Sequence, residues 1–133
     1  MSAAPRWISR AAVLLLHEQS IATFGGARGI RDEGLLDSAL ARPPNAYGYR
    51  PEVSIAELAA SYAYGLAKNH ALVDGNKRAA FLSIGVFLAI NGFALNAEQP
   101  DAIRTMLAVA NGELGELELA SWIQDNLVQS APV

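Results

Sequence analysis

Cysteine is absent from this chain of 133 residues, which excludes disulfide bonds and thiolate metal sites. A reducing compartment is consistent with that composition. Histidine is almost as scarce, because His17 and His70 are the only two in the sequence. Two imidazoles are too few to indicate a metal centre built from histidines.

Basic residues and long apolar runs are also in short supply. The 10 Lys and Arg are outnumbered by 13 Asp and Glu, which argues against a broad nucleic-acid surface but allows a local basic pocket. The longest largely apolar stretch, Ala79 to Ile90, has twelve residues, whereas a membrane helix needs roughly 20. The run from Ala11 to Leu16 is shorter than a secretory signal requires. We therefore expect a soluble, cytoplasmic protein that binds neither membranes nor nucleic acid directly.

The sequence does contain a repeated helical pattern of apolar residues. Hydrophobic residues make up 52% of the chain and charged residues 17%, which is typical of a folded protein. The length predicts a single domain over residues 1–133. Start and stop residues delimit about six helices. They run from Ser9 to Gly25, from Asp32 to Pro43, from Ser54 to Asn69, from Asn76 to Ile90, from Pro100 to Asn111, and through a last segment carrying Leu117 to Leu127.

Two segments give sharper expectations about the fold. The helix from Asn76 to Ile90 has no polar face after its first turn, so we expect it to be the central, fully buried helix of an all-α domain. Residues 43–51, "PPNAYGYRP", combine proline, glycine and tyrosine, which predicts a turn, a short hairpin or a flap. Only "GFALN", residues 92–96, hints at a strand.

The start of the helix at Asn76 carries an unusual arrangement of charge. Helix N-termini bear partial positive charge and unpaired N–H groups, yet this helix opens with Lys77 and Arg78. Asp74 is a single anion against both cations. A phosphate-bearing ligand would resolve the conflict, because the free N–H groups would bind its oxygens and the cations would neutralise it. Gly75 would let the backbone approach closely.

His70 and Asp74 add possible chemistry beside that phosphate site. A histidine near neutral pKa can take a proton from a hydroxyl, and a carboxylate beside phosphates commonly holds magnesium. The plainer alternative makes Lys77 and Arg78 solvated charges, Asp74 a capping residue and His70 a cation at a helix C-terminus. The residues alone leave both interpretations open, and "DGNKR" lacks the spacing of a Walker loop.

The segment "HALVDGNKRAA", residues 70–80, resembles the signature of the Fic/Doc superfamily, roughly H-x-F-x-[DE]-x-N-[KG]-R. All its polar positions are matched, by His70, Asp74, Asn76, Lys77 and Arg78, and Leu72 stands at the aromatic position. Residues 14–43 and the later "FLAINGF" are similar to the Doc, or death-on-curing, branch.

This resemblance implies a toxin of a bacterial toxin–antitoxin pair. Such a toxin transfers a phosphoryl group from ATP or another nucleoside triphosphate to a threonine of elongation factor Tu and stops translation. By resemblance, His70 is the general base and Asp74 coordinates Mg²⁺. Asn76 and Arg78 hold the phosphates, together with backbone N–H groups from Gly75 onward.

Lys77 distinguishes the branches, because Fic enzymes that transfer AMP have glycine there. The lysine implies an inverted nucleotide whose γ-phosphate is presented for attack, and hence a kinase. Two alternatives stay open: an AMP transferase on the same fold, and a catalytically inert module that only binds an antitoxin.

The resemblance also implies regulation by a separate chain. No internal inhibitory motif of the form [ST]-x-x-x-E-[GN] occurs, so a cognate antitoxin whose disordered tail folds over the site is expected. Trp7, Tyr47 and Tyr49 are either lining residues of its groove or core residues.

Four further features have two interpretations each. His17 is either a buried core histidine or a contact to the site. Arg28 and Arg31 are either loop charges or substrate contacts. The segment 43–51 is either an ordinary connection or a flap that clamps the acceptor peptide.

Overall fold

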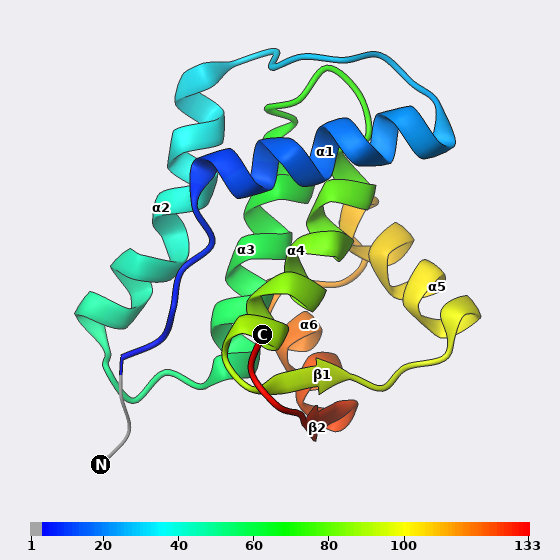
Figure 1. Cartoon of the computed structure of the whole chain (residues 1–133). Helices are drawn as coiled ribbons and strands as arrows, with labels where there is room; N and C mark the ends of the chain where they lie inside the picture. Colours follow the sequence, from blue (N-terminus) through cyan, green and yellow to red (C-terminus); the bar gives the residue numbers. More distant parts are fainter. Residues whose placement is uncertain (1–3) are drawn as a thin grey trace.

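A computed structural model describes residues 4–133, so the first three residues of the predicted domain lie outside the described part. In that part, the all-α prediction is confirmed: six helices form the fold, with one small two-stranded sheet (Figure 1). The elements are α1 (Arg10–Phe24), α2 (Glu33–Tyr49), α3 (Ile55–Asn69), α4 (Asn76–Ile90), β1 (Phe93–Leu95), α5 (Gln99–Ala110), α6 (Glu116–Asp125) and β2 (Leu127–Gln129). No helix among residues 4–133 is long and apolar enough to cross a membrane.

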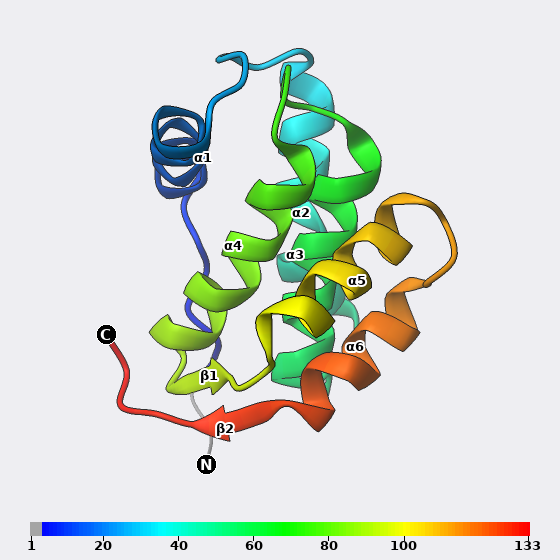
Figure 2. The ribbon, with the colours of Figure 1, turned by 90° about the vertical axis from the view of Figure 1, so that its right-hand side faces the viewer.

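The central helix is α3, and the prediction that α4 is buried on all sides is wrong. Helix α3 packs against α2, α4, α5 and α6, and Figure 2 shows it running between α4 and the pair α5 and α6. Most of its residues are buried, and many are alanines, whose small side chains allow neighbouring helices to approach from several directions. Helix α4 buries one face, whereas Phe81 and Leu82 are half-buried and Gly85 is exposed.

Helix α2 continues through Pro43 and Pro44 to Tyr49, so the predicted turn, hairpin or flap at 43–51 is wrong for residues 43–49. A turn follows only at Arg50, whose carbonyl accepts from the N–H of Val53. Proline inside a helix removes an N–H donor and costs roughly 3 kcal/mol. Tertiary packing offsets that cost here. Pro43 is buried, and the Tyr47 ring meets the Trp7 ring edge-on with centroids 5.9 Å apart.

The three aromatic residues considered for a groove divide between core and surface. Trp7 stacks on Phe87 of α4 with ring centroids 6.0 Å apart, and both Trp7 and Tyr47 pack against the buried core. Tyr49, at the end of α2, is 95% exposed. Of the three, only Tyr49 is free on the surface for a partner.

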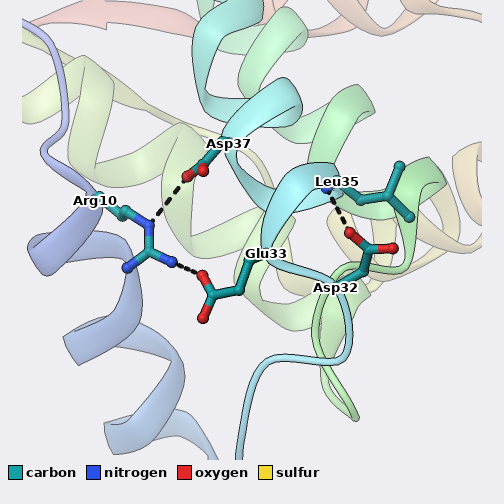
Figure 3. A network of polar contacts seen from close by, with 5 residues as sticks. All are labelled: Arg10, Asp32, Glu33, Leu35 and Asp37. Atoms are coloured by element: carbon teal, nitrogen blue, oxygen red, sulfur yellow. Dashed lines mark hydrogen bonds and ion pairs between the residues drawn. The ribbon is translucent and has the colours of Figure 1, made fainter.

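The helix starts follow the predicted caps. Ser9, Asp32 and Ser54 each accept a hydrogen bond from a backbone N–H of the first turn. Figure 3 shows the start of α2, where Asp32 accepts from the N–H of Leu35 at 2.9 Å. Arg10 of α1 reaches across to the carboxylates of Glu33 and Asp37. Exposed pairs of this kind contribute about 0–1 kcal/mol, so they add little to the stability of the fold.

The two-stranded sheet joins the segment after α4 to the segment after α6. The strand predicted in "GFALN" is confirmed as β1, and β1 pairs antiparallel with β2 so that Leu95 lies opposite Leu127. The last helix was expected to include Leu127, but it ends at Asp125. Leu127 has the right helical spacing from Ile123, and pairing with β1 takes it into a strand instead.

Replacing either of two helical glycines by alanine should change the stability of the fold, in opposite directions. A Cβ at Gly65 of α3 would lie 2.8 Å from Cδ of Arg42 and 3.3 Å from Cα of Ala39, whereas one at Gly85 of α4 would meet no atom within 4 Å. We expect Gly85→Ala to stabilise the fold by about 0.5–1 kcal/mol through helix propensity. Gly65→Ala should destabilise it, because overpacking costs typically 1–3 kcal/mol.

Urea unfolding of the two variants measures both free energies, and each variant is the control for the other. A Gly65→Ala protein as stable as Gly85→Ala would contradict the close contact between α2 and α3.

Candidate active site

The motif residues lie in the turn between α3 and α4. Helix α3 ends at Asn69 and is capped by His70, which is exposed and has a φ of 51°, in the left-handed region. The turn is closed by Asn76: its Oδ1 accepts from the N–H of Leu72, and its Nδ2 donates to the carbonyl of Leu72, both at 3.0 Å. The Asn76 side chain therefore closes the turn. The backbone N–H of Asn76 is one of the groups at the start of α4 that no side chain caps.

The loop between α1 and α2 lies alongside this turn (Figure 1). Ile30 and Leu72 form an isolated antiparallel bridge, and the N–H of Val73 donates to the carbonyl of Gly29 at 3.0 Å. The guanidinium of Arg31 donates to the carbonyl of His70 at 2.6 Å. Of the two interpretations of Arg31, loop structure is the one observed, because its cation caps the C-terminus of α3.

Asp74 is held by both segments. Its carboxylate accepts from the N–H of Ala27 at 3.1 Å and from the N–H of Gly75 at 2.8 Å. These two hydrogen bonds, with smaller contributions from Arg78 and His17, lower the pKa of Asp74 below its ordinary value. The side chain is exposed and stays ionised near neutral pH, as a metal ligand must.

Two glycines make this placement of Asp74 feasible. Gly75 has a φ of 74°, in the region that favours glycine. Gly26 has a φ of 120°, and a Cβ there would lie 2.6 Å from Oδ2 of Asp74. Any larger residue at position 26 would displace the carboxylate.

The N-terminus of α4 is open. Gly75 is its N-cap, and no side chain among the described residues caps its first-turn N–H groups. Lys77 is exposed. Arg78 is half-buried: its guanidinium lies 4.6 Å from the centre of the Phe24 ring and donates to the Ser20 hydroxyl at 3.4 Å. The plainer interpretation of Arg78 as a freely solvated charge is therefore incomplete, because α1 holds its orientation.

Several groups from α1 and the following loop were not among the predicted site residues. They are Ser20, Phe24 and Ala27. His17 was given two interpretations, and both apply: it is 3% exposed, and its Nε2 lies 2.7 Å from the carbonyl oxygen of Asp74. The sequence carried one signal, since His17, Ser20 and Phe24 share a face with the buried Ile21. Polar residues on an apolar stripe indicate a buried polar contact.

A family model described as the Fic/DOC family matches residues 7–88, which is more than half of the chain and includes every predicted site residue. The chain belongs to the Fic/DOC family. The resemblance carried by residues 70–80 is confirmed. The matched region also includes α1 and its loop, which supply the contacts to Asp74 and Arg78.

Two relatives agree with this membership. The chain is 49% identical over 76 residues to "Toxin Doc" of Mycolicibacterium smegmatis, a match that covers 56% of this chain and 58% of that protein. The chain thus spans little more than half the length of this relative. It is 28% identical over 119 residues to "Protein kinase doc" of Escherichia phage P1, covering 90% of this chain and 94% of that protein.

The candidate site would hold magnesium only together with a phosphate ligand. No group of three or more His, Asp or Glu residues within the described chain can hold a metal by itself. Asp74 offers one exposed, ionised carboxylate. That arrangement suits Mg²⁺, which keeps several waters and is commonly bound by one or two carboxylates plus substrate phosphates.

The close approach of Gly26 to Asp74 predicts how a substitution at position 26 changes the pKa of Asp74. In the native chain, Asp74 should titrate below the ordinary aspartate pKa of about 3.9. The stability linked to this depressed pKa is present above the unfolded value and is lost as pH falls through the folded value. Gly26→Ala should raise the pKa of Asp74 toward the ordinary value, because the added methyl displaces the carboxylate from its two N–H donors.

Carbon NMR of the Asp74 carboxyl group during an acid titration gives the titration midpoint of Asp74 in the native protein and in Gly26→Ala. Gly25→Ala is the matched control, because Gly25 also has positive φ but its Cβ would meet nothing. Equal Asp74 midpoints in Gly26→Ala and Gly25→Ala would show that a methyl group at position 26 does not disturb the carboxylate.

Proposed function

We propose that the chain is a Doc-like toxin that transfers the γ-phosphoryl group of a nucleoside triphosphate to a hydroxyl of a protein. The observation that carries the proposal is the uncapped N-terminus of α4, where Lys77, Arg78 and the ionised Asp74 gather next to an exposed His70. The names of the two relatives, a toxin and a protein kinase, support the same activity.

The phosphates would bind at the first turn of α4. Its N–H groups from Asn76 onward point out of the helix end, and the helix dipole favours negative charge there. Arg78 would bind phosphate oxygens from an orientation already set by Phe24 and Ser20, which reduces the entropy lost on binding. Asp74 would hold Mg²⁺, which supplies charge neutralisation on the transferring phosphoryl group.

His70 would act as the general base. It lies at the end of α3 with its carbonyl fixed by Arg31, so its ring is presented at the surface where a protein substrate can approach. The acceptor hydroxyl oxygen bonds to the γ-phosphorus as its proton passes to the imidazole. The bond from the γ-phosphorus to the bridging oxygen breaks, and the nucleoside diphosphate leaves.

The proposal extends to the acceptor protein, to the regulator and to the location of the toxin. The acceptor is a threonine of elongation factor Tu, as the resemblance to the Doc branch implies, and this target places the toxin in the cytoplasm. A cognate antitoxin would cover the site with a tail that folds on binding. The exposed Tyr49 offers such a partner an aromatic contact.

An AMP transferase is the second candidate. The fold and most of the motif suit both reactions, and Lys77 favours the kinase because glycine stands there in the AMP-transferring branch. A catalytically inert module is disfavoured, since His70 and Asp74 are both present and both accessible.

The proposal predicts a specific product. Purified protein incubated with elongation factor Tu, Mg²⁺ and ATP should add one phosphoryl group to the factor, as read by intact mass. His70→Ala should lower the rate by about 10²–10⁴-fold, the typical contribution of a general base. Its unfolding temperature should hardly change, because His70 is exposed.

Two outcomes would count against the kinase assignment, and a third against the role of His70. An adenylyl group on the factor would favour the AMP transferase, and no product together with no cellular toxicity would favour the inert module. Full activity in His70→Ala would remove His70 as the base.

Lys77 has its own test. Lys77→Gly should shift the products from phosphoryl toward adenylyl transfer. The substitution removes the bulk and charge that keep the phosphates out of the pose expected when glycine stands at this position. Lys77→Ala is the control: it removes the charge but keeps a Cβ and the helix propensity that glycine lacks by about 1 kcal/mol. The product ratio in the mass assay measures the shift. Unchanged phosphorylation by Lys77→Gly would contradict the role given to this lysine.

A further inference from the structure

His17 contacts the turn that carries Asp74 from the opposite side to the solvent. It lies in α1, far from the motif in sequence, and is buried. Its Nε2 is 2.7 Å from the carbonyl oxygen of Asp74. A Cβ added to Gly75 would lie 3.6 Å from the imidazole and 3.4 Å from Cδ1 of Ile21, so the ring and Ile21 together support the peptide between Asp74 and Gly75.

The chemistry of this contact fixes the proton on the ring. A carbonyl oxygen only accepts, so Nε2 of His17 must carry the hydrogen. The 2.7 Å distance is within the normal range for a hydrogen bond. A histidine whose only proton is on Nδ1 would place two acceptors against each other in a buried site, which is costly.

The peptide group transmits this contact to the carboxylate. The bond between Asp74 and Gly75 is trans, so its carbonyl and its N–H point in opposite directions within one plane. With the carbonyl fixed on His17, the Gly75 N–H points away from α1. There it donates to Oδ1 of Asp74 at 2.8 Å. The orientation of one buried imidazole thus sets the direction of a donor that holds the exposed carboxylate.

We propose that His17 is a positioning residue for Asp74, acting through the peptide between Asp74 and Gly75. The inference rests on the proposed function for its kinetic consequence but not for the hydrogen bond itself. His17 does not touch the nucleotide or the acceptor. Its removal lets the peptide between Asp74 and Gly75 rotate, and the carboxylate then loses the fixed direction of its Gly75 N–H donor.

Two substitutions at position 17 separate the donor from the packing. Glutamine can place an amide N–H near the position of Nε2, whereas leucine fills the buried space without a donor. We expect His17→Leu to lower kcat for phosphoryl transfer by about 10- to 100-fold, the range typical of residues that orient a metal ligand. KM for the protein acceptor should stay unchanged, and His17→Gln should recover most of kcat.

A readout that needs no activity distinguishes this inference from the proposed function. Nitrogen NMR of the imidazole in the native protein should show the Nε2–H form, and the Gly75 amide resonance should move in His17→Leu and return in His17→Gln. If the native protein transfers nothing to any acceptor, the proposed function fails, and these spectra still decide the role of His17.

Three results would overturn the inference: an Nδ1–H ring, an unmoved Gly75 amide in His17→Leu, or a folded His17→Gln as slow as His17→Leu. If His17→Leu fails to fold, the ring spectrum of the native protein and the rate of His17→Gln still test it.

Discussion

The turn from Ala71 to Gly75 must end α3 and start α4 within five residues, and the candidate site depends on how this turn is held. Three sets of contacts hold it. The Asn76 side chain bonds to the backbone of Leu72, and Ile30 of the loop after α1 pairs with Leu72. His17 of α1 donates to the carbonyl of Asp74. Because the turn is fixed in this way, an exposed histidine, an ionised carboxylate and an uncapped helix start have defined positions.

Helix α1 and its loop contribute as much to the site as the motif does. One face of α1 supplies the donor to the Asp74 carbonyl, the hydroxyl that accepts from Arg78 and the ring beneath its guanidinium. The following loop supplies the Ala27 N–H. This explains how an acidic chain, with a net charge of -3, tolerates two cations at a helix N-terminus. The local anion Asp74 and the aromatic contact offset part of the repulsion, and phosphate binding would offset the rest.

The sequence predicted the local features well, because caps and turns depend on neighbouring residues. Ser9, Asp32 and Ser54 start helices as expected, and the motif marks the turn. Features that depend on distant packing were mispredicted. Pro43 and Pro44 remain helical because α2 packs on the core, and α3 is central because its alanines allow close approach. The donor to Asp74 from Ala27 is a backbone group, which no side-chain motif can reveal.

The proposed activity requires the first turn of α4 to bind the phosphates of a nucleotide. Proton–nitrogen correlation spectra recorded while ATP and Mg²⁺ are added test it most directly, because they report each backbone N–H separately. We expect the largest shifts at Asn76, Lys77 and Arg78, and much weaker shifts when Asp74 is replaced by asparagine. Shifts confined to another region, such as the cavity of about 130 Å³ lined by Ser61 and Glu116, would contradict it. So would the absence of any shift at saturating nucleotide.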